Sequence, residues 1–126
     1  MRLLIMVGIA GAAGALSRYG LSNAVSRICG GNFPWGTLCV NLIGCFLIGL
    51  IMHISLNTDI IPNEWRTTII VGFLGAFTTF SSFSYETIGL IEKSDYTAAT
   101  GNIAINVIAG LTATIVGLTV GKIITS

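Results

Sequence analysis

Residues 67–85 read TTIIVGFLGAFTTFSSFSY, with no Asp, Glu, Lys or Arg among them. A helix needs roughly 20 predominantly apolar residues to cross a bilayer, and this run is long enough for one crossing. Three more runs are equally free of charge, at residues 3–17, 28–58 and 96–121. We therefore expect four transmembrane helices, over about 3–26, 35–56, 64–91 and 97–121.

The composition supports an all-α membrane protein. Hydrophobic residues make up 53% of the chain and charged residues only 9%, with a mean hydropathy of +0.88, whereas soluble domains carry about 25% charged residues. We expect the first span to be retained rather than cleaved, because it contains Arg18 and no clear signal-peptidase site. The loops near 27–34, 57–63 and 92–96 are short. One four-helix domain over 1–126 is therefore predicted, with both termini on the same side of the membrane.

Neither a metal site built from clustered side chains nor nucleic-acid binding is indicated. The three cysteines lack metal-ligand spacing and are interpreted as small apolar fillers. The net charge is +1 and no basic cluster is present, so we expect no nucleic-acid partner. No nucleophile–base set or phosphate loop can be assembled, so the chain is predicted not to be an enzyme.

Small residues are spread through the predicted helices, as in Gly8, Gly11 and Gly14 of the first span and the Gly117-x-x-x-Gly121 pair of the fourth. Such spacing lets helix backbones approach closely in lipid. A tight bundle of four helices has no room for a pore of its own. The sequence therefore predicts a homodimer.

The Lys and Arg residues are balanced across the membrane. Arg2, Arg66 and Lys122 fall on the side of the termini, while Arg27, Lys93 and the more deeply placed Arg18 fall toward the other side. Orientation normally follows an excess of positive residues on the cytoplasmic side. A chain without that excess can insert both ways, which predicts an antiparallel dual-topology homodimer. If Arg18 is buried, a weak bias of three against two remains.

The third span holds five hydroxyl residues within seven positions, which are Thr78, Thr79, Ser81, Ser82 and Ser84. Gly72 and Gly75 come just before them and weaken the helix. Broken helices at membrane depth occur where freed backbone groups line a cavity or bind an ion. We expect the third helix to be broken mid-membrane, rather than continuous with its hydroxyls bonded to the preceding turn.

Several further side chains are candidates for an ion path. Phe80 and Phe83 are three residues apart and share a helix face, where their positive ring edges can face an anion. Asn41 offers an amide with two donors, or else joins helices. Polar and small residues recur every four positions in the fourth span, forming either a packing seam or the wall of an aqueous path, and these are Asn102, Asn106, Gly110 and Thr114.

Arg18 and Glu86 are the charges within the spans that require an explanation. An unpaired charge is costly in lipid. We expect both near span ends, at a vestibule or an interface, with a structural or electrostatic role. His53, near the end of the second span, receives no catalytic role.

Three stretches resemble the fluoride channel family (Fluc, also called CrcB). They are Gly75-Ala-Phe-Thr-Thr-Phe-Ser-Ser-Phe83 in the third span, Gly11-Ala-Ala-Gly-Ala-Leu-Ser-Arg-Tyr19 in the first, and Gly36-Thr-Leu-Cys-Val-Asn-Leu-Ile-Gly44 in the second. The resemblance covers essentially the whole chain, with the three motifs in the family's order.

The resemblance implies an antiparallel homodimer with two pores that exports fluoride passively from the cytoplasm, in the bacterial plasma (inner) membrane. It also implies a structural Na⁺ at the dimer centre, held by backbone carbonyls that correspond to those of Gly75 and Thr78. The pore residues that we expect on this basis, together with the hydroxyl cluster and the fourth-span stripe, are Asn41, Phe80, Phe83, Ser81, Thr79, Asn106 and Thr114.

Two other classes remain as alternatives. Small multidrug-resistance-type exporters are also four-helix, dual-topology dimers, but they couple export to protons through a Glu in the first helix, and this first span has no carboxylate. A non-conducting assembly subunit would leave the polar third span without a purpose.

Overall fold

The computed structural model describes all residues, 1–126, and its regular elements are all helices. Three long helices are continuous: α1 (Arg2–Cys29), α2 (Trp35–Asn57) and α6 (Tyr96–Thr125). The third long segment consists of α3 (Asn63–Thr67), the π-helix η1 (Thr68–Leu74), α4 (Gly75–Phe77) and α5 (Phe80–Glu92). All four are long and apolar enough to cross a membrane. The predicted spans are confirmed, with ends that differ by a few residues.

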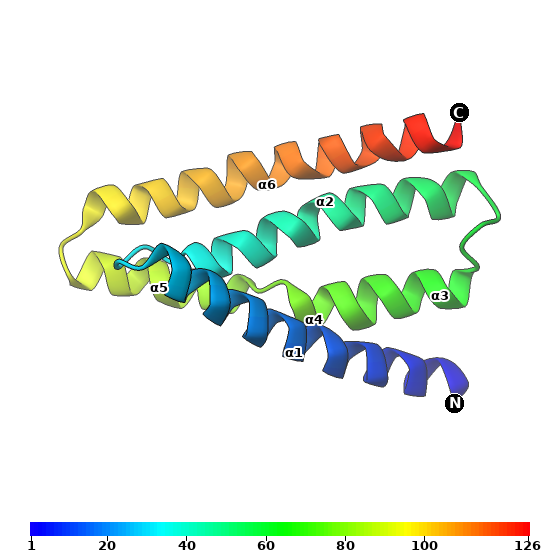
Figure 1. The fold of residues 1–126 in the computed structure, drawn as a ribbon, viewed down its shortest axis with the longest axis horizontal. Helices are drawn as coiled ribbons and strands as arrows, with labels where there is room; N and C mark the ends of the chain where they lie inside the picture. Colours follow the sequence, from blue (N-terminus) through cyan, green and yellow to red (C-terminus); the bar gives the residue numbers. More distant parts are fainter.

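The four long segments lie side by side and alternate in direction, so that both termini are at the same end of the molecule (Figure 1). α2 packs mainly against α6, whereas α1 packs against η1 and α4. The third span therefore has α1 on one side and α2 on another. This arrangement places the centre of the third span between the other helices.

At several places, Gly14 and Gly117 among them, the helices approach so closely that only glycine fits. A Cβ atom at Gly14 of α1 would overlap the carbonyl of Phe73 in η1, and a Cβ at Gly117 of α6 would overlap the carbonyl of Phe46 in α2. Backbones that meet in this way gain dispersion contacts that lipid tails cannot supply. The prediction of a tight bundle is confirmed at both places.

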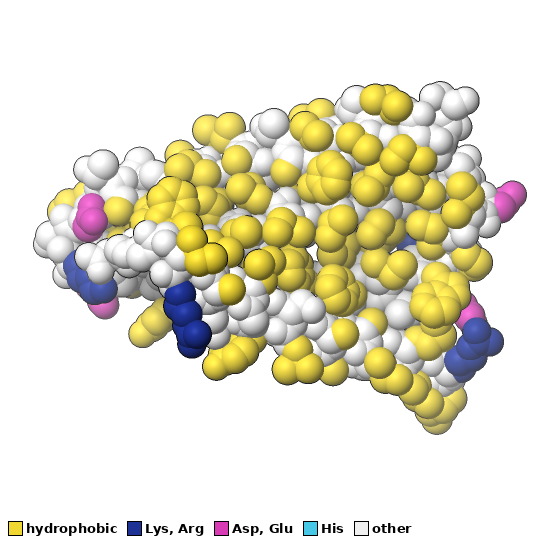
Figure 2. All heavy atoms as spheres, in the orientation of Figure 1, with side chains coloured by type: hydrophobic (Ala, Val, Ile, Leu, Met, Phe, Trp, Pro, Cys, Tyr) yellow, Lys and Arg dark blue, Asp and Glu magenta, His cyan; other side chains and the backbone are white.

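The chain buries few of its hydrophobic side chains. The buried hydrophobic residues are Leu38, Val40, Leu74, Phe77, Leu90 and Ala99. Apolar side chains cover most of the length of the visible face, while charged side chains lie mostly toward its two ends (Figure 2). A surface of this kind is suited to lipid and to other apolar partners.

Asn63 and the Ser94–Asp95 pair are residue types that commonly cap helices, and they stand where the third and fourth spans begin, but only Asp95 provides a cap. The Asp95 side chain accepts a hydrogen bond from the backbone N–H of Ala98 at 3.1 Å and caps α6. Asn63 is the first residue of α3 rather than its cap, because Pro62 occupies the capping position and no side chain caps that helix.

Candidate functional site

The third span is interrupted at two residues, Thr78 and Thr79. Their backbones are extended, with φ −87° and ψ 160° at Thr78 and φ −152° and ψ 121° at Thr79. Gly75, by contrast, is helical at φ −62° and ψ −34°. The glycines that precede the hydroxyl cluster therefore do not themselves leave the helix, and Gly72 is instead needed for the close contact with Val7 and Ala10 of α1.

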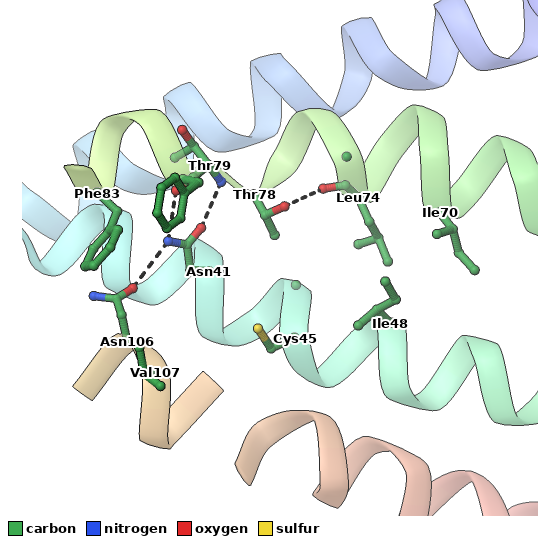
Figure 3. Close-up of a pocket in the computed structure, with 13 residues that line it drawn as sticks. Asn41, Cys45, Ile48, Ile70, Leu74, Thr78, Thr79, Phe83, Asn106 and Val107 are labelled. Carbon is green, nitrogen blue, oxygen red and sulfur yellow. Dashed lines mark hydrogen bonds between the residues drawn. The ribbon is translucent and has the colours of Figure 1, made fainter. Parts of the chain in front are cut away.

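Asn41 of α2 bonds to both backbone groups of Thr79. The Thr79 N–H donates to Asn41 Oδ1 at 2.9 Å, and Asn41 Nδ2 donates to the Thr79 carbonyl at 3.1 Å (Figure 3). A buried backbone group without a partner is costly, and Thr79 is 8% exposed. The Asn41 amide therefore replaces the helical partners that Thr79 lacks.

The side chains of the two threonines stabilise the helix ends on either side. Thr78 Oγ1 donates to the Leu74 carbonyl at 2.9 Å, one turn back. Thr79 Oγ1 accepts from the backbone N–H of Ser82 at 3.1 Å and caps α5, as N-terminal hydroxyls commonly do. The sequence Thr-Thr is thus suited to ending one helix and starting the next.

Thr78 also fits against a glycine of α2. A Cβ atom at Gly44 would overlap Thr78 Cγ2 and would lie 3.7 Å from the Phe77 ring. Gly44 is buried and lies three residues after Asn41, on the same face of α2. The two extended residues, Thr78 and Thr79, therefore contact the same face of α2.

A cavity of about 360 Å³ opens beside the interruption (Figure 3). Seven of the predicted site residues line it: Asn41, Gly75, Thr78, Thr79, Phe80, Phe83 and Asn106. The rest of the lining, which is mostly apolar, consists of Gly44, Cys45, Ile48, Ile70, Leu74 and Val107. Residues from α2, the third span and α6 thus meet at one place.

The other four predicted residues do not line this cavity. Ser81 is exposed, with its hydroxyl 3.2 Å from Thr79 Oγ1. Thr114 donates to the carbonyls of Cys45 and Gly110 at 3.1 and 3.2 Å, so its hydroxyl joins α6 to α2. Arg18 bonds to the backbone of Thr78, and Glu86 bonds to the Thr37 hydroxyl.

Phe80 and Phe83 form a tilted aromatic pair with ring centroids 5.4 Å apart. Phe83 is half-buried, but Phe80 is 78% exposed although it lines the cavity. The cavity is therefore open on the side of the Phe80 ring.

We expected Arg18 near a span end, and this prediction is wrong. The side chain lies beside the interruption of the third span. Its Nη1 donates to the Thr78 carbonyl at 3.4 Å, and the side chain is half-buried. Thr78 is extended, so the carbonyl is free to accept this bond. The guanidinium thereby adds a positive charge next to the centre of the third span.

Glu86 lies near the end of the bundle where α2 begins. Its Oε1 accepts a hydrogen bond from the Thr37 hydroxyl at 2.7 Å, while its Oε2 is buried and unpaired. Thr37 is in the first turn of α2, so this position agrees with the expectation for Glu86.

The α6 stripe is mainly a packing seam. Asn102 is 1% exposed, and Gly110 and Thr114 face α2. Only Asn106 lines the cavity, where its Oδ1 accepts from Asn41 Nδ2 at 3.3 Å. The packing-seam interpretation therefore holds for Asn102, Gly110 and Thr114, while the interpretation as the wall of an aqueous path stays a prediction for Asn106.

Gly44 and Thr87 also belong to the surroundings of the site, although no role was predicted for either. Thr87 is buried and accepts a hydrogen bond from Asn102 Nδ2 at 2.9 Å. The spacing of Gly44 from Asn41, and of Thr87 from Phe83, places each on the face of a recognised site residue. That spacing was the available signal.

Comparison with known proteins agrees with these features. The chain matches the family model described as "CrcB-like protein, Camphor Resistance (CrcB)" over residues 5–118. It is 47% identical over 122 residues to the fluoride-specific ion channel FluC of Citrifermentans bemidjiense, covering 97% of this chain and 98% of the relative.

Two further relatives carry the same name. The FluC of Solidesulfovibrio magneticus is 43% identical, covering 94% of each chain. The FluC of Dehalococcoides mccartyi is 40% identical, covering 96% of this chain and 93% of the relative. Matches of this identity over nearly full length, together with the family model, show that the chain, a multi-pass membrane protein, belongs to the CrcB family.

Proposed function

We propose that this chain is a fluoride-selective ion channel, and not an enzyme, which exports fluoride passively from the cytoplasm across the bacterial plasma (inner) membrane. The observation that carries the proposal is the interrupted third span, whose Thr79 backbone is paired by Asn41 beside a cavity that Phe80 and Phe83 line. The relatives described above are named fluoride-specific ion channels.

The chemistry of the cavity is suited to a small anion. Fluoride is strongly hydrated, so a selective path must replace its water with closely placed donors. The ring edges of Phe80 and Phe83 supply positive groups at the cavity without a Lys that would trap the ion. The Ser81 hydroxyl lies outside the cavity lining, 3.2 Å from Thr79 Oγ1. The Asn41 amide has no N–H left to donate to fluoride in this structure, because Thr79 and Asn106 accept from its nitrogen. Its contribution to the path is therefore indirect, through the Thr79 backbone.

The functional unit in this proposal is an antiparallel homodimer with two pores. Phe80 is largely exposed and the cavity is open beside it. A second copy packed on this face would close the cavity and cover the ring. The interruption then lies in the middle of the membrane, where a partner rather than lipid surrounds it.

A structural Na⁺ at the dimer centre completes the proposal. The Thr79 N–H donates to Asn41 instead of to the Gly75 carbonyl, and Gly75 is exposed. The carbonyls of Gly75 and Thr78 are hard oxygen ligands, and the third span has no Asp or Glu between Glu64 and Glu86 that would favour a divalent ion. Arg18 also bonds to the Thr78 carbonyl, so the Gly75 carbonyl is the better ligand of the two in the isolated subunit.

The sodium proposal predicts a structural and not a coupled ion. Removal of Na⁺ from both sides of the membrane should impair fluoride flux, whereas a Na⁺ gradient should not drive it. Full activity without Na⁺ or a substituting cation would contradict the site, and so would sodium-coupled transport.

A proton-coupled multidrug exporter is less well supported. The charged residues of α1 are Arg2, Arg18 and Arg27, without a carboxylate to carry a proton. A pH gradient should therefore not drive efflux of a lipophilic cation.

The deciding experiment is fluoride efflux from liposomes that contain the purified protein. We expect rapid passive efflux of fluoride once the membrane potential is collapsed, with chloride efflux close to that of empty liposomes. Equal rates for both anions, or no efflux of either, would refute a fluoride-selective channel.

A further inference from the structure

The interruption is connected to a buried part of the bundle by a series of hydrogen bonds that runs through three helices. The Thr79 N–H donates to Asn41 Oδ1, and Asn41 Nδ2 donates to Asn106 Oδ1 at 3.3 Å (Figure 3). Asn106 Nδ2 then donates to Asn102 Oδ1 at 2.9 Å. The series thus passes from the third span to α2 and on to α6.

The series returns to the third span through two buried side chains. Asn102 Nδ2 donates to Thr87 Oγ1 at 2.9 Å, and the Thr87 hydroxyl donates to the Phe83 carbonyl at 2.7 Å. Both ends of the series are therefore backbone groups of the third span: the Thr79 N–H, just before the aromatic pair, and the carbonyl of Phe83, the second residue of that pair.

Chemistry allows this series only one direction. A backbone N–H, as at Thr79, can only donate, and a carbonyl, as at Phe83, accepts. Each amide in between must present its oxygen to one neighbour and its nitrogen to the next. Turning the Asn41 or Asn106 amide around would bring two donors or two acceptors together at its contacts. Turning the Asn102 amide around would bring its nitrogen against that of Asn106, and the Thr87 hydroxyl would have to leave the Phe83 carbonyl to donate to the Asn102 oxygen.

Asn102 and Thr87 do not line the cavity, and they are 1% and 5% exposed. They contact the site only through Asn106 and Asn41 or through the backbone of Phe83. In a buried series, each hydrogen bond polarises the next. A donor left without an acceptor at Asn102 would therefore weaken the bonds that follow toward Thr79.

We propose that Thr87 and Asn102 are positioning residues of the conduction site. They determine which way the Asn106 and Asn41 amides point, and so hold Thr79 extended at the cavity wall. The effect on fluoride flux rests on the function proposed above, while the effect on the Thr79 backbone does not.

The test replaces Thr87 by Val, which has nearly the same shape but no hydroxyl. Asn102 Nδ2 then loses its acceptor. The matched control is Thr68→Val, because Thr68 is also buried and its hydroxyl bonds only to the Glu64 carbonyl of the preceding turn, at 2.7 Å. Thr87→Ser restores the hydroxyl and should restore the parent behaviour.

The first readout is hydrogen exchange of the Thr79 backbone amide, measured by NMR relative to the amides of α2. We expect Thr87→Val to accelerate it about tenfold, the size that follows from leaving one buried donor unpaired. Thr68→Val and Thr87→Ser should leave the relative rate unchanged. If Thr87→Val does not yield a folded protein, Thr87→Ala removes the same hydroxyl with no added methyl group.

The second readout is fluoride efflux from liposomes, which should fall about tenfold in Thr87→Val and remain at the parent rate in Thr87→Ser. An unchanged Thr79 exchange rate in both Thr87→Val and Thr87→Ala would overturn the positioning role. A parent protein that carries no fluoride would instead refute the proposed function, and Thr79 exchange would still decide the role of Thr87.

Discussion

At the scale of single residues, Asn41 has the largest structural effect on the site, because its amide pairs with both backbone groups of Thr79. Asn41→Asp keeps the shape but removes both N–H donors, and it brings carboxylate oxygens toward the Thr79 carbonyl. We expect fluoride flux to fall at least about tenfold, since buried groups lose their partners. Liposome efflux measures this loss.

The control for that change is Asn57→Asp. Asn57 is exposed and its side chain bonds to the His53 carbonyl of its own helix, so its replacement should leave flux unchanged. Parent-like flux in Asn41→Asp would show that the pairing with Thr79 is dispensable.

The two rings beside the cavity provide a second prediction at this scale. Phe80→Ile or Phe83→Ile removes the positive ring edges and should lower fluoride flux by roughly threefold to tenfold, the range of aromatic interaction energies. In size-exclusion chromatography, both variants should elute at the same volume as the parent protein. Phe33→Ile is the control, because Phe33 pairs with Trp35 at the start of α2, outside the cavity. If both variants conduct like the parent, the rings serve only in packing.

At the scale of elements, the fit of the third span on α2 depends on Gly44, where a Cβ atom would overlap the Thr78 methyl group. Thr78 cannot turn freely, because it is β-branched and its hydroxyl bonds to Leu74. We expect Gly44→Ala to destabilise the protein by about 1–3 kcal/mol. The thermal midpoint in detergent, followed by size-exclusion chromatography, measures this.

A second substitution tests the cause. Thr78→Ser removes the methyl group and keeps the hydroxyl, so it should restore much of the stability lost in Gly44→Ala. Gly8→Ala is the control, because a Cβ there meets no atom within 4 Å. A double variant no more stable than Gly44→Ala alone would show that the overlap with Thr78 is not the cause.

At the scale of the whole molecule, the proposed antiparallel dimer depends on a chain that inserts in both orientations. Arg18 bonds to the Thr78 carbonyl, away from the ends of α1, so the positive residues near the two ends number three against two, still almost balanced.

In a variant with Cys29, Cys39 and Cys45 replaced by Ala, Ser126→Cys should react with a membrane-impermeant maleimide from both sides to comparable extents. The control is a protein that keeps Cys29 as its sole cysteine. Cys29 ends α1, at the end of the molecule away from the termini, and should also react from both sides. Reaction from one side only would refute dual topology.

The four spans, their boundaries and the polar character of the third were predictable from the sequence, because they follow from local runs of apolar residues and hydroxyls that every neighbouring residue reinforces. The sequence also predicted weakness of the helix between Gly75 and Thr79, and Thr78 and Thr79 are the extended residues. Only the tertiary structure decided that Asn41 pairs with Thr79, that Arg18 lies at the Thr78 carbonyl and that Gly44 receives the Thr78 methyl group. These contacts join residues 34 to 60 positions apart, and the rotation of each helix about its axis, which periodicity barely constrains in a chain so uniformly apolar, determines which side chains meet.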